Sequence, residues 1–127
     1  MLKNAPVKAS LPAVDIGRAK TFYAEKLGLV PSSEDAGGLL YECGDGTGLV
    51  VFSARAVASG KHTQANFQVA DAAAEVIELK KRGVVFEEYD FPGLKTVDSI
   101  ADLPNGARSA WFKDSEGNII AVVQRPT

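Results

Sequence analysis

The chain carries one pattern of elements twice. A strand that leads into a helix at residues 11–15 (LPAVD) recurs at residues 67–71 (FQVAD), 56 positions later. Two strands around a Gly-rich turn at residues 40–52 recur at 110–122, now 70 positions later. A repeat of this size cannot bury its apolar faces alone. The two halves are therefore expected to share one core and to form a cleft where they meet.

Apolar periodicity and capping residues predict the same order of elements in each half. Asp15 and Asp71 are expected to cap helices, and Gly28 and Gly83 to end them. The prolines and glycines of residues 91–106 indicate a long loop, with room for one short strand or turn. The predicted helices are 15–26 and 71–82; the predicted strands are 7–13, 29–33, 38–43, 49–53, 63–69, 84–89, 107–113 and 118–124.

Composition excludes several classes of function. The net charge of −2 and a pI near 5.4 give no footprint for nucleic acid or an anionic membrane. No apolar run is long enough to span a bilayer. The single cysteine, Cys43, cannot form an intrachain disulfide and is compatible with a reducing compartment. A soluble, cytoplasmic protein is expected.

Two motifs carry a family resemblance. Phe22-Tyr23-x-x-x-Leu27-Gly28-Leu29 in the first helix and residues 111–118 (WFKDSEGN) before the last strand resemble the vicinal oxygen chelate superfamily. That superfamily includes glyoxalase I, extradiol dioxygenases and bleomycin-binding proteins. The resemblance covers essentially the whole chain. It implies a single α+β domain of two βαβββ modules, residues 5–54 and 62–126, with curled mixed sheets around a shared cavity, helices outside, and usually a homodimer.

The resemblance also marks the positions that hold a metal ion in metal-using members. Carried over to this chain, they are Lys8, Val51, Gln64 and Ala121. Valine and alanine offer no donor, an ammonium repels a cation, and one amide oxygen cannot hold a divalent ion. No metal and no other cofactor is therefore expected. His62, the only histidine, lies near Gln64 but would stand alone as a ligand, and we interpret it as a surface residue.

The polar faces of the two first strands are the predicted ligand surface, although solvent exposure alone would produce the same alternation. Amides, a hydroxyl and an ammonium there suit an oxygen-rich ligand. Tyr41 and Trp111, equivalent by the 70-residue repeat, are candidate ring platforms, and core packing is the alternative for both. The predicted ligand-binding residues are Lys8, Ser10, Tyr41, Val51, Gln64, Asn66, Gln68, Trp111 and Ala121.

Two functions from different classes are compatible with these residues. The first is a metal-independent module that sequesters a small oxygen-rich organic molecule. The second is a lyase, isomerase or dioxygenase acting on a small carbonyl or aromatic metabolite. In its metal-free form, Lys8 and Gln64 would hold a carbonyl while Glu88 moves a proton. The donor-rich, acid-poor face favours binding over catalysis.

Overall fold

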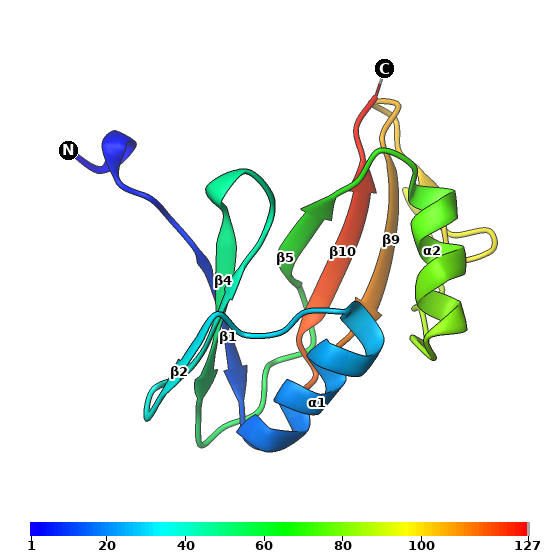
Figure 1. The fold of residues 1–127 in the computed structure, drawn as a ribbon. Helices are drawn as coiled ribbons and strands as arrows, with labels where there is room; N and C mark the ends of the chain where they lie inside the picture. The colour runs from blue at the N-terminus through cyan, green and yellow to red at the C-terminus, as the bar shows by residue number, and fades with distance from the viewer. Residues whose placement is uncertain (127) are drawn as a thin grey trace.

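The computed structural model describes residues 1–126 and contains two modules of the same topology (Figure 1). Both four-stranded sheets are mixed, with orders β1-β4-β3-β2 and β5-β10-β9-β8. The α+β class and the paired βαβββ modules are as predicted. The first module holds β1 (Ala9–Ala13), α1 (Ile16–Leu27), β2 (Ser33–Asp35), β3 (Gly38–Glu42) and β4 (Gly48–Ser53). The second holds β5 (Thr63–Gln68), α2 (Ala72–Lys81), β6 (Asp90–Phe91), β7 (Leu94–Lys95), β8 (Ala101–Asp102), β9 (Arg108–Lys113) and β10 (Ile119–Gln124).

The helix boundaries follow from the capping residues. The Asp15 carboxylate accepts a hydrogen bond from the Arg18 N–H at 3.0 Å. Asp71 caps α2 in the same way, accepting from the Ala74 N–H at 3.1 Å. Gly28 ends α1 with a φ of 68°, a left-handed conformation that a side chain would strain. These helix starts and the end of α1 were predicted from the sequence.

The strand predicted at 29–33 in the first module is instead β2 at Ser33–Asp35, and in the second module one strand prediction was wrong. Residues 84–89 form no strand and contribute a single bridge, between Phe86 and Phe112. Residues 91–106, which were predicted as a loop, contain the last residue of β6 and the short strands β7 and β8. The β8 strand pairs with the first residues of β9, and Phe86 forms its bridge with Phe112 further along β9. Both segments therefore lie along the outer edge of the sheet. The strands are two residues long, too short for a periodic signal.

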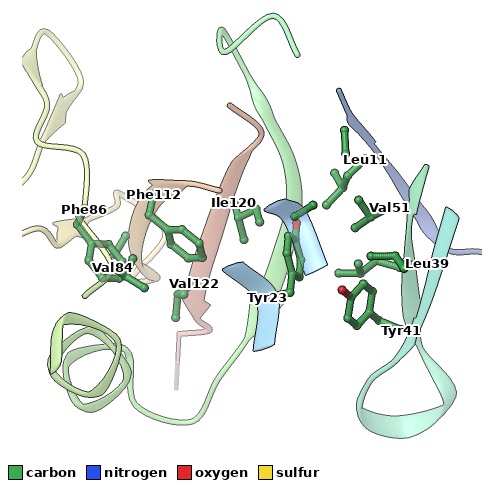
Figure 2. Close-up of a cluster of buried hydrophobic side chains, with 14 of the residues drawn as sticks. Leu11, Tyr23, Leu39, Tyr41, Val51, Val84, Phe86, Phe112, Ile120 and Val122 are labelled. Carbon is green, nitrogen blue, oxygen red and sulfur yellow. The ribbon is translucent and has the colours of Figure 1, made fainter. Parts of the chain in front are cut away.

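Each sheet has one face turned to a common core (Figure 2). We call these the core faces. Tyr23 of α1 lies between them and stacks on Tyr41, with ring centroids 5.2 Å apart. Val76 of α2 belongs to the same cluster. The first core face comprises Leu11, Leu39, Tyr41, Leu49 and Val51, and the second comprises Phe67, Ala110, Phe112, Ile120 and Val122.

The opposite side of each sheet is an open face that no helix covers. Because the two core faces point toward each other across α1, the two open faces point away from each other (Figure 2). One chain therefore does not enclose a cavity shared by both open faces. The first open face comprises Ser10, Pro12, Leu40, Val50 and Phe52, and the second comprises Asn66, Gln68, Ser109, Trp111, Ala121 and Val123.

A buried polar cluster joins the two modules at the base of the molecule. Asp114, in the β9–β10 turn, accepts hydrogen bonds from the Tyr23 hydroxyl and the Asn118 side-chain amide, both at 2.8 Å. Glu116 accepts from Arg18 Nε at 2.7 Å and from the Asp15 N–H at 3.0 Å. The second family motif thus joins the two modules, and we call this cluster the latch.

Candidate ligand-binding face

The second open face brings an amide and an indole into one row. Asn66 of β5 pairs with Ala121 of β10, which pairs with Trp111 of β9. The small side chain of Ala121 therefore lies between the amide and the ring, where it is 1% exposed. Gln68 lies in the next row, beside Val123. Four of the predicted ligand-binding residues, Asn66, Gln68, Trp111 and Ala121, thus share one face.

A hollow of about 400 Å³ adjoins this row at the side of Trp111. Its most distinctive feature is a set of aromatic rings. The Tyr89 ring meets the Trp111 ring edge-on with centroids 5.5 Å apart, and lies 5.7 Å from the Phe91 ring. The volume falls within the range of small-molecule pockets in proteins. The hollow is lined by Gly60, Lys61, His62, Thr63, Glu87, Tyr89, Phe91, Leu94, Trp111 and Ile119.

The charges around this hollow are only weakly paired. Glu87 Oε1 lies 3.8 Å from Lys113 Nζ, a long contact between half-exposed side chains. Burial, and to a smaller extent the Glu87 charge, raises the pKa of the Tyr89 hydroxyl, so this hydroxyl stays protonated at neutral pH. His62 Nδ1 lies 3.4 Å from Ser59 Oγ and is exposed, in line with its interpretation as a surface residue. A ligand here would meet rings, a carboxylate and cations at the rim.

Lys8 and Ser10 belong to the first module. Ser10 pairs with Val50 on the first open face. A Cβ placed on Gly48 would lie 3.5 Å from Lys8 Nζ, which puts the ammonium over the neighbouring strand. The side chains of Lys8 and Ser10 therefore belong to the first open face, whereas those of Asn66, Gln68 and Trp111 belong to the second. The predicted joint use of Lys8 and Gln64 on one carbonyl stays a prediction.

Tyr41 and Val51 were placed on the wrong face by the sequence prediction. Leu11 pairs with Val51, and its equivalent Phe67 pairs with Val122. The last strand of the second module is therefore offset from the last strand of the first by 71 positions. The offset of 70 was one residue short, and a one-residue slip moves every side chain to the opposite face of a strand. Tyr41 and Val51 are fully buried in the core. Burial raises the pKa of the Tyr41 hydroxyl to about 12.

Glu88 is fixed by a neighbouring turn. Its carboxylate accepts hydrogen bonds from the Thr96 hydroxyl at 2.6 Å and from the Ser99 hydroxyl at 2.9 Å. These bonds, that from Thr96 first, hold the pKa of Glu88 below its usual value. A carboxylate stabilised in this way is a weak base, so the proton-transfer role considered for Glu88 is not supported.

Gln64 occupies a β-bulge. Thr63 pairs with Ile119 and Ala65 with the next residue, Ile120, which leaves Gln64 without a partner in β10. Its Oε1 is buried and accepts no hydrogen bond. In residues 1–126, no three His, Cys, Asp or Glu side chains lie close enough together to hold a metal ion. The four positions marked by the family pattern are likewise not gathered, since Val51 lies in the core.

Sequence reasoning missed the aromatic wall of the hollow. Tyr89 stands in an acidic run and Phe91 in the segment interpreted as a loop, so neither carries a periodic signal. The available signal was composition: two aromatic residues within three positions, next to a predicted ligand face.

The protein thus consists of two βαβββ modules whose sheets carry helices on one face and are open on the other. By sequence, the chain matches no family model and no curated protein. By structure, it is similar to three informative proteins. A bleomycin resistance determinant encoded on the transposon Tn5 has a TM-score of 0.74 at 20% identity, covering 98% of this chain and 100% of the other.

The second is a bleomycin-binding protein complexed with bleomycin, with a TM-score of 0.73 at 20% identity, covering 96% and 99% of the two chains. The third is a lactoylglutathione lyase from Agrobacterium tumefaciens, with a TM-score of 0.66 at 25% identity, covering 95% and 93%. The chain therefore has the fold of the glyoxalase and bleomycin resistance proteins, as the resemblance to the vicinal oxygen chelate superfamily implied. No helix within residues 1–126 is long and apolar enough to cross a membrane.

Proposed function

We propose that this protein binds a small, planar, oxygen-rich organic molecule on its second open face and sequesters it unchanged, without a metal ion. The observation that carries the proposal is the row of Asn66, Ala121 and Trp111 beside the Tyr89 ring. An indole offers a stacking surface and the amide offers donors and acceptors, with a small residue between them. The similarity in fold to bleomycin-binding proteins supports this choice.

Metal independence rests on the donor chemistry. The family's metal positions carry Lys8, Val51, Gln64 and Ala121, which include no carboxylate or imidazole. Binding by stacking and hydrogen bonding needs neither. We also expect the protein to act in the cytoplasm, where the single thiol of Cys43 would stay reduced.

We further propose a homodimer in which the first open face of one chain covers the second open face of another. The first open face carries apolar side chains at Leu40, Val50 and Phe52, and Phe52 is 36% exposed. Lys8 and Ser10 of one chain would then approach the ligand held by its partner. This arrangement would place Lys8, Ser10, Asn66 and Gln68 of the predicted ligand surface around one cavity.

A thermal-shift screen of antibiotics, including bleomycin, and of aromatic metabolites tests the binding function. Trp111 is the only tryptophan, so its fluorescence reports directly on this face. We expect a hit to raise Tm, to change the Trp111 emission and to be recovered unchanged. Ile77→Ala, at an exposed position of α2, is the matched control and should bind like the wild type. A panel-wide absence of stabilisation, or binding that leaves Trp111 emission unaltered, would contradict the proposal.

A second function is favoured by one observation: His62 and Glu87 line the same hollow as the aromatic rings. An imidazole and a weakly paired carboxylate at a ligand could transfer protons, as an isomerase or lyase requires. Chemical conversion of a hit, lost in both His62→Gln and Glu87→Gln, would establish the enzyme. Retention of the hit unchanged in the wild type would exclude it for that compound.

A further inference from the structure

A separate cleft of about 360 Å³ lies between the two modules, above the latch. Its lining comes from β1 and the β3–β4 hairpin on one side and from β5 on the other. Burial raises the pKa of the Cys43 thiol, so this group is a neutral part of the wall. The cleft is lined by Ala9, Cys43, Gly44, Asp45, Thr47, Gly48, Leu49, Ala65, Asn66, Phe67 and Gln68.

One wall of the cleft is the free edge of β1. Within a strand, the N–H and C=O of one residue point to one side and those of the next residue to the other. The Ala13 carbonyl accepts from the Ala54 N–H, so Ala13 faces β4. Pro12 therefore faces outward, and its carbonyl accepts from the Asn118 side chain. By the same alternation, the backbone N–H and C=O of Ser10 also face outward.

The facing wall is the free edge of β5. The Val69 N–H donates to the Val123 carbonyl, and Gln68 is paired with Val123, so Phe67 and Val69 face β10. The backbone groups of Asn66 and Gln68 therefore face away from β10, toward β1. Both residues line the cleft. β1 and β5 run in opposite directions, touching at the base and separating above it (Figure 1).

At the closed end of this cleft, an amide already pairs with the free edge of β1. There the Asn118 amide donates to the outward carbonyl of Pro12 at 3.0 Å. A side-chain amide thus takes the place that a backbone amide would take beside β1. In residues 1–126, every hydrogen bond between the modules lies at this base, and none crosses the cleft above it. The small side chains of Ala9 and Ala65 leave room there for a backbone.

We propose that the cleft binds an extended peptide segment, which adds a strand between β1 and β5 and pairs with Ser10 on one side and with Asn66 and Gln68 on the other. Main-chain hydrogen bonds to free strand edges are a recurrent mode of peptide recognition. The wall carries both signs of charge, the Asp45 carboxylate and the Lys8 ammonium beside Gly48, so recognition rests on the strand edges and not on a charged peptide side chain. This site is distinct from the second open face, because it uses the backbone of Asn66 and Gln68 and not the Trp111 ring.

The test uses the acetylated and amidated peptide Thr-Val-Lys-Val-Thr and the full chain. We expect the peptide to slow hydrogen exchange at the amides of Ser10, Asn66 and Gln68, measured by NMR. The same peptide N-methylated at its three central residues lacks the donors and should bind about tenfold more weakly or worse. Protection of β9 and β10 amides around Trp111 instead would place the peptide on the open face and overturn the proposal.

Two protein variants sharpen the test. Asn66→Pro removes one outward N–H but no ladder hydrogen bond, and should weaken peptide binding. Asp45→Asn, which leaves both strand edges unchanged, is the matched control and should bind the peptide like the wild type. If the proline variant does not fold, the exchange measurement on the wild type still decides. Absence of binding at millimolar peptide, equal binding of the N-methylated peptide, or preference for a peptide of residues 1–8 of this chain would overturn the proposal. That last result would identify the occupant as the arm of a second copy.

Discussion

The core faces of the two sheets have similar side chains, whereas their open faces do not. On the core side, Leu11 corresponds to Phe67 and Val51 to Val122, and all four are apolar. On the open side, the equivalents differ in chemistry. Ser10, Leu40, Val50 and Phe52 of the first module stand where the second has Asn66, Trp111, Ala121 and Val123.

This difference separates two requirements. Both core faces must exclude water together with the helices, so both halves retain apolar side chains there. The open faces face no such common demand. An indole, amides and a small residue suit a ligand, whereas leucine, valine and phenylalanine suit a protein surface that covers it. The comparison therefore supports the proposal that the second module contacts the ligand and the first covers it.

The largest expected effect separates the two faces of one strand. Phe112→Ala should lower the free energy of unfolding by about 3–5 kcal/mol, because it leaves a cavity in the core. Its neighbour Trp111 faces the open side, and Trp111→Ala should cost much less stability. Urea denaturation of both variants measures the difference. Equal losses would mean that Trp111 is a core residue.

The next effect concerns the latch that sets the two sheets against each other. Tyr23→Phe removes the hydroxyl that donates to Asp114 and should cost about 1.5–3 kcal/mol, the range for a hydrogen bond to a charged group. Tyr89→Phe, on the open side, is the matched control and should be near neutral. If the Tyr23 variant proved as stable as the wild type, the latch would not hold the modules together.

A pH dependence follows from Glu116. The hydrogen bond from Arg18, helped by the Asp15 N–H and Ser115, lowers the pKa of Glu116 to about 2. Because its pKa is lower in the folded state, its contribution to stability is complete above about pH 4.5 and is lost as the pH falls toward 2. The stability advantage of the wild type over Glu116→Gln should therefore shrink between these values. An advantage independent of pH across this window would rule out the carboxylate as its source.

The smallest expected effect on folding concerns the first open face. Phe52→Ser should change the stability of the isolated chain by no more than about 0.5 kcal/mol, because the residue is partly exposed. It should nevertheless weaken the proposed dimer, measured by light scattering over a range of concentrations. Val85→Ser, at a position 80% exposed and outside this face, is the control. A dimer unaffected by Phe52→Ser would leave the first open face without its assigned role.

The sequence predicted the elements that obey a local rule. Asp15, Asp71 and Gly28 mark helix ends through interactions within a few residues, so they could be recognised directly. The polar face of β5 was also predicted, because alternation along a strand is local. The pairing of distant strands was not. Tyr41 and Val51 went to the wrong face because the second repeat offset was taken one residue short, and β-strand register magnifies that error.

The relation between the modules was equally beyond sequence reasoning. The alternation of residues 7–13 does not predict that Lys8 and Ser10 belong to a different open face from Asn66 and Gln68. That arrangement depends on α1 lying between the core faces and on the contacts of Tyr23 with Asp114, residues 91 positions apart. Glu88 was proposed as a base for its charge alone, and its bonds to Thr96 and Ser99 became visible only in three dimensions.

The most direct test exchanges the open-face residues of the two modules. Leu40 of the first sheet and Trp111 of the second occupy equivalent positions. The two variants are Trp111→Leu and Leu40→Trp, each of which introduces the side chain of the other sheet. Calorimetric titration with bleomycin, or with the tightest ligand from the screen, compares both variants with the wild type. We predict that Trp111→Leu weakens binding about thirtyfold or more, as loss of a central aromatic contact does, while Leu40→Trp changes it only a few-fold. Unchanged affinity in Trp111→Leu would contradict the assignment of the ligand to the second open face.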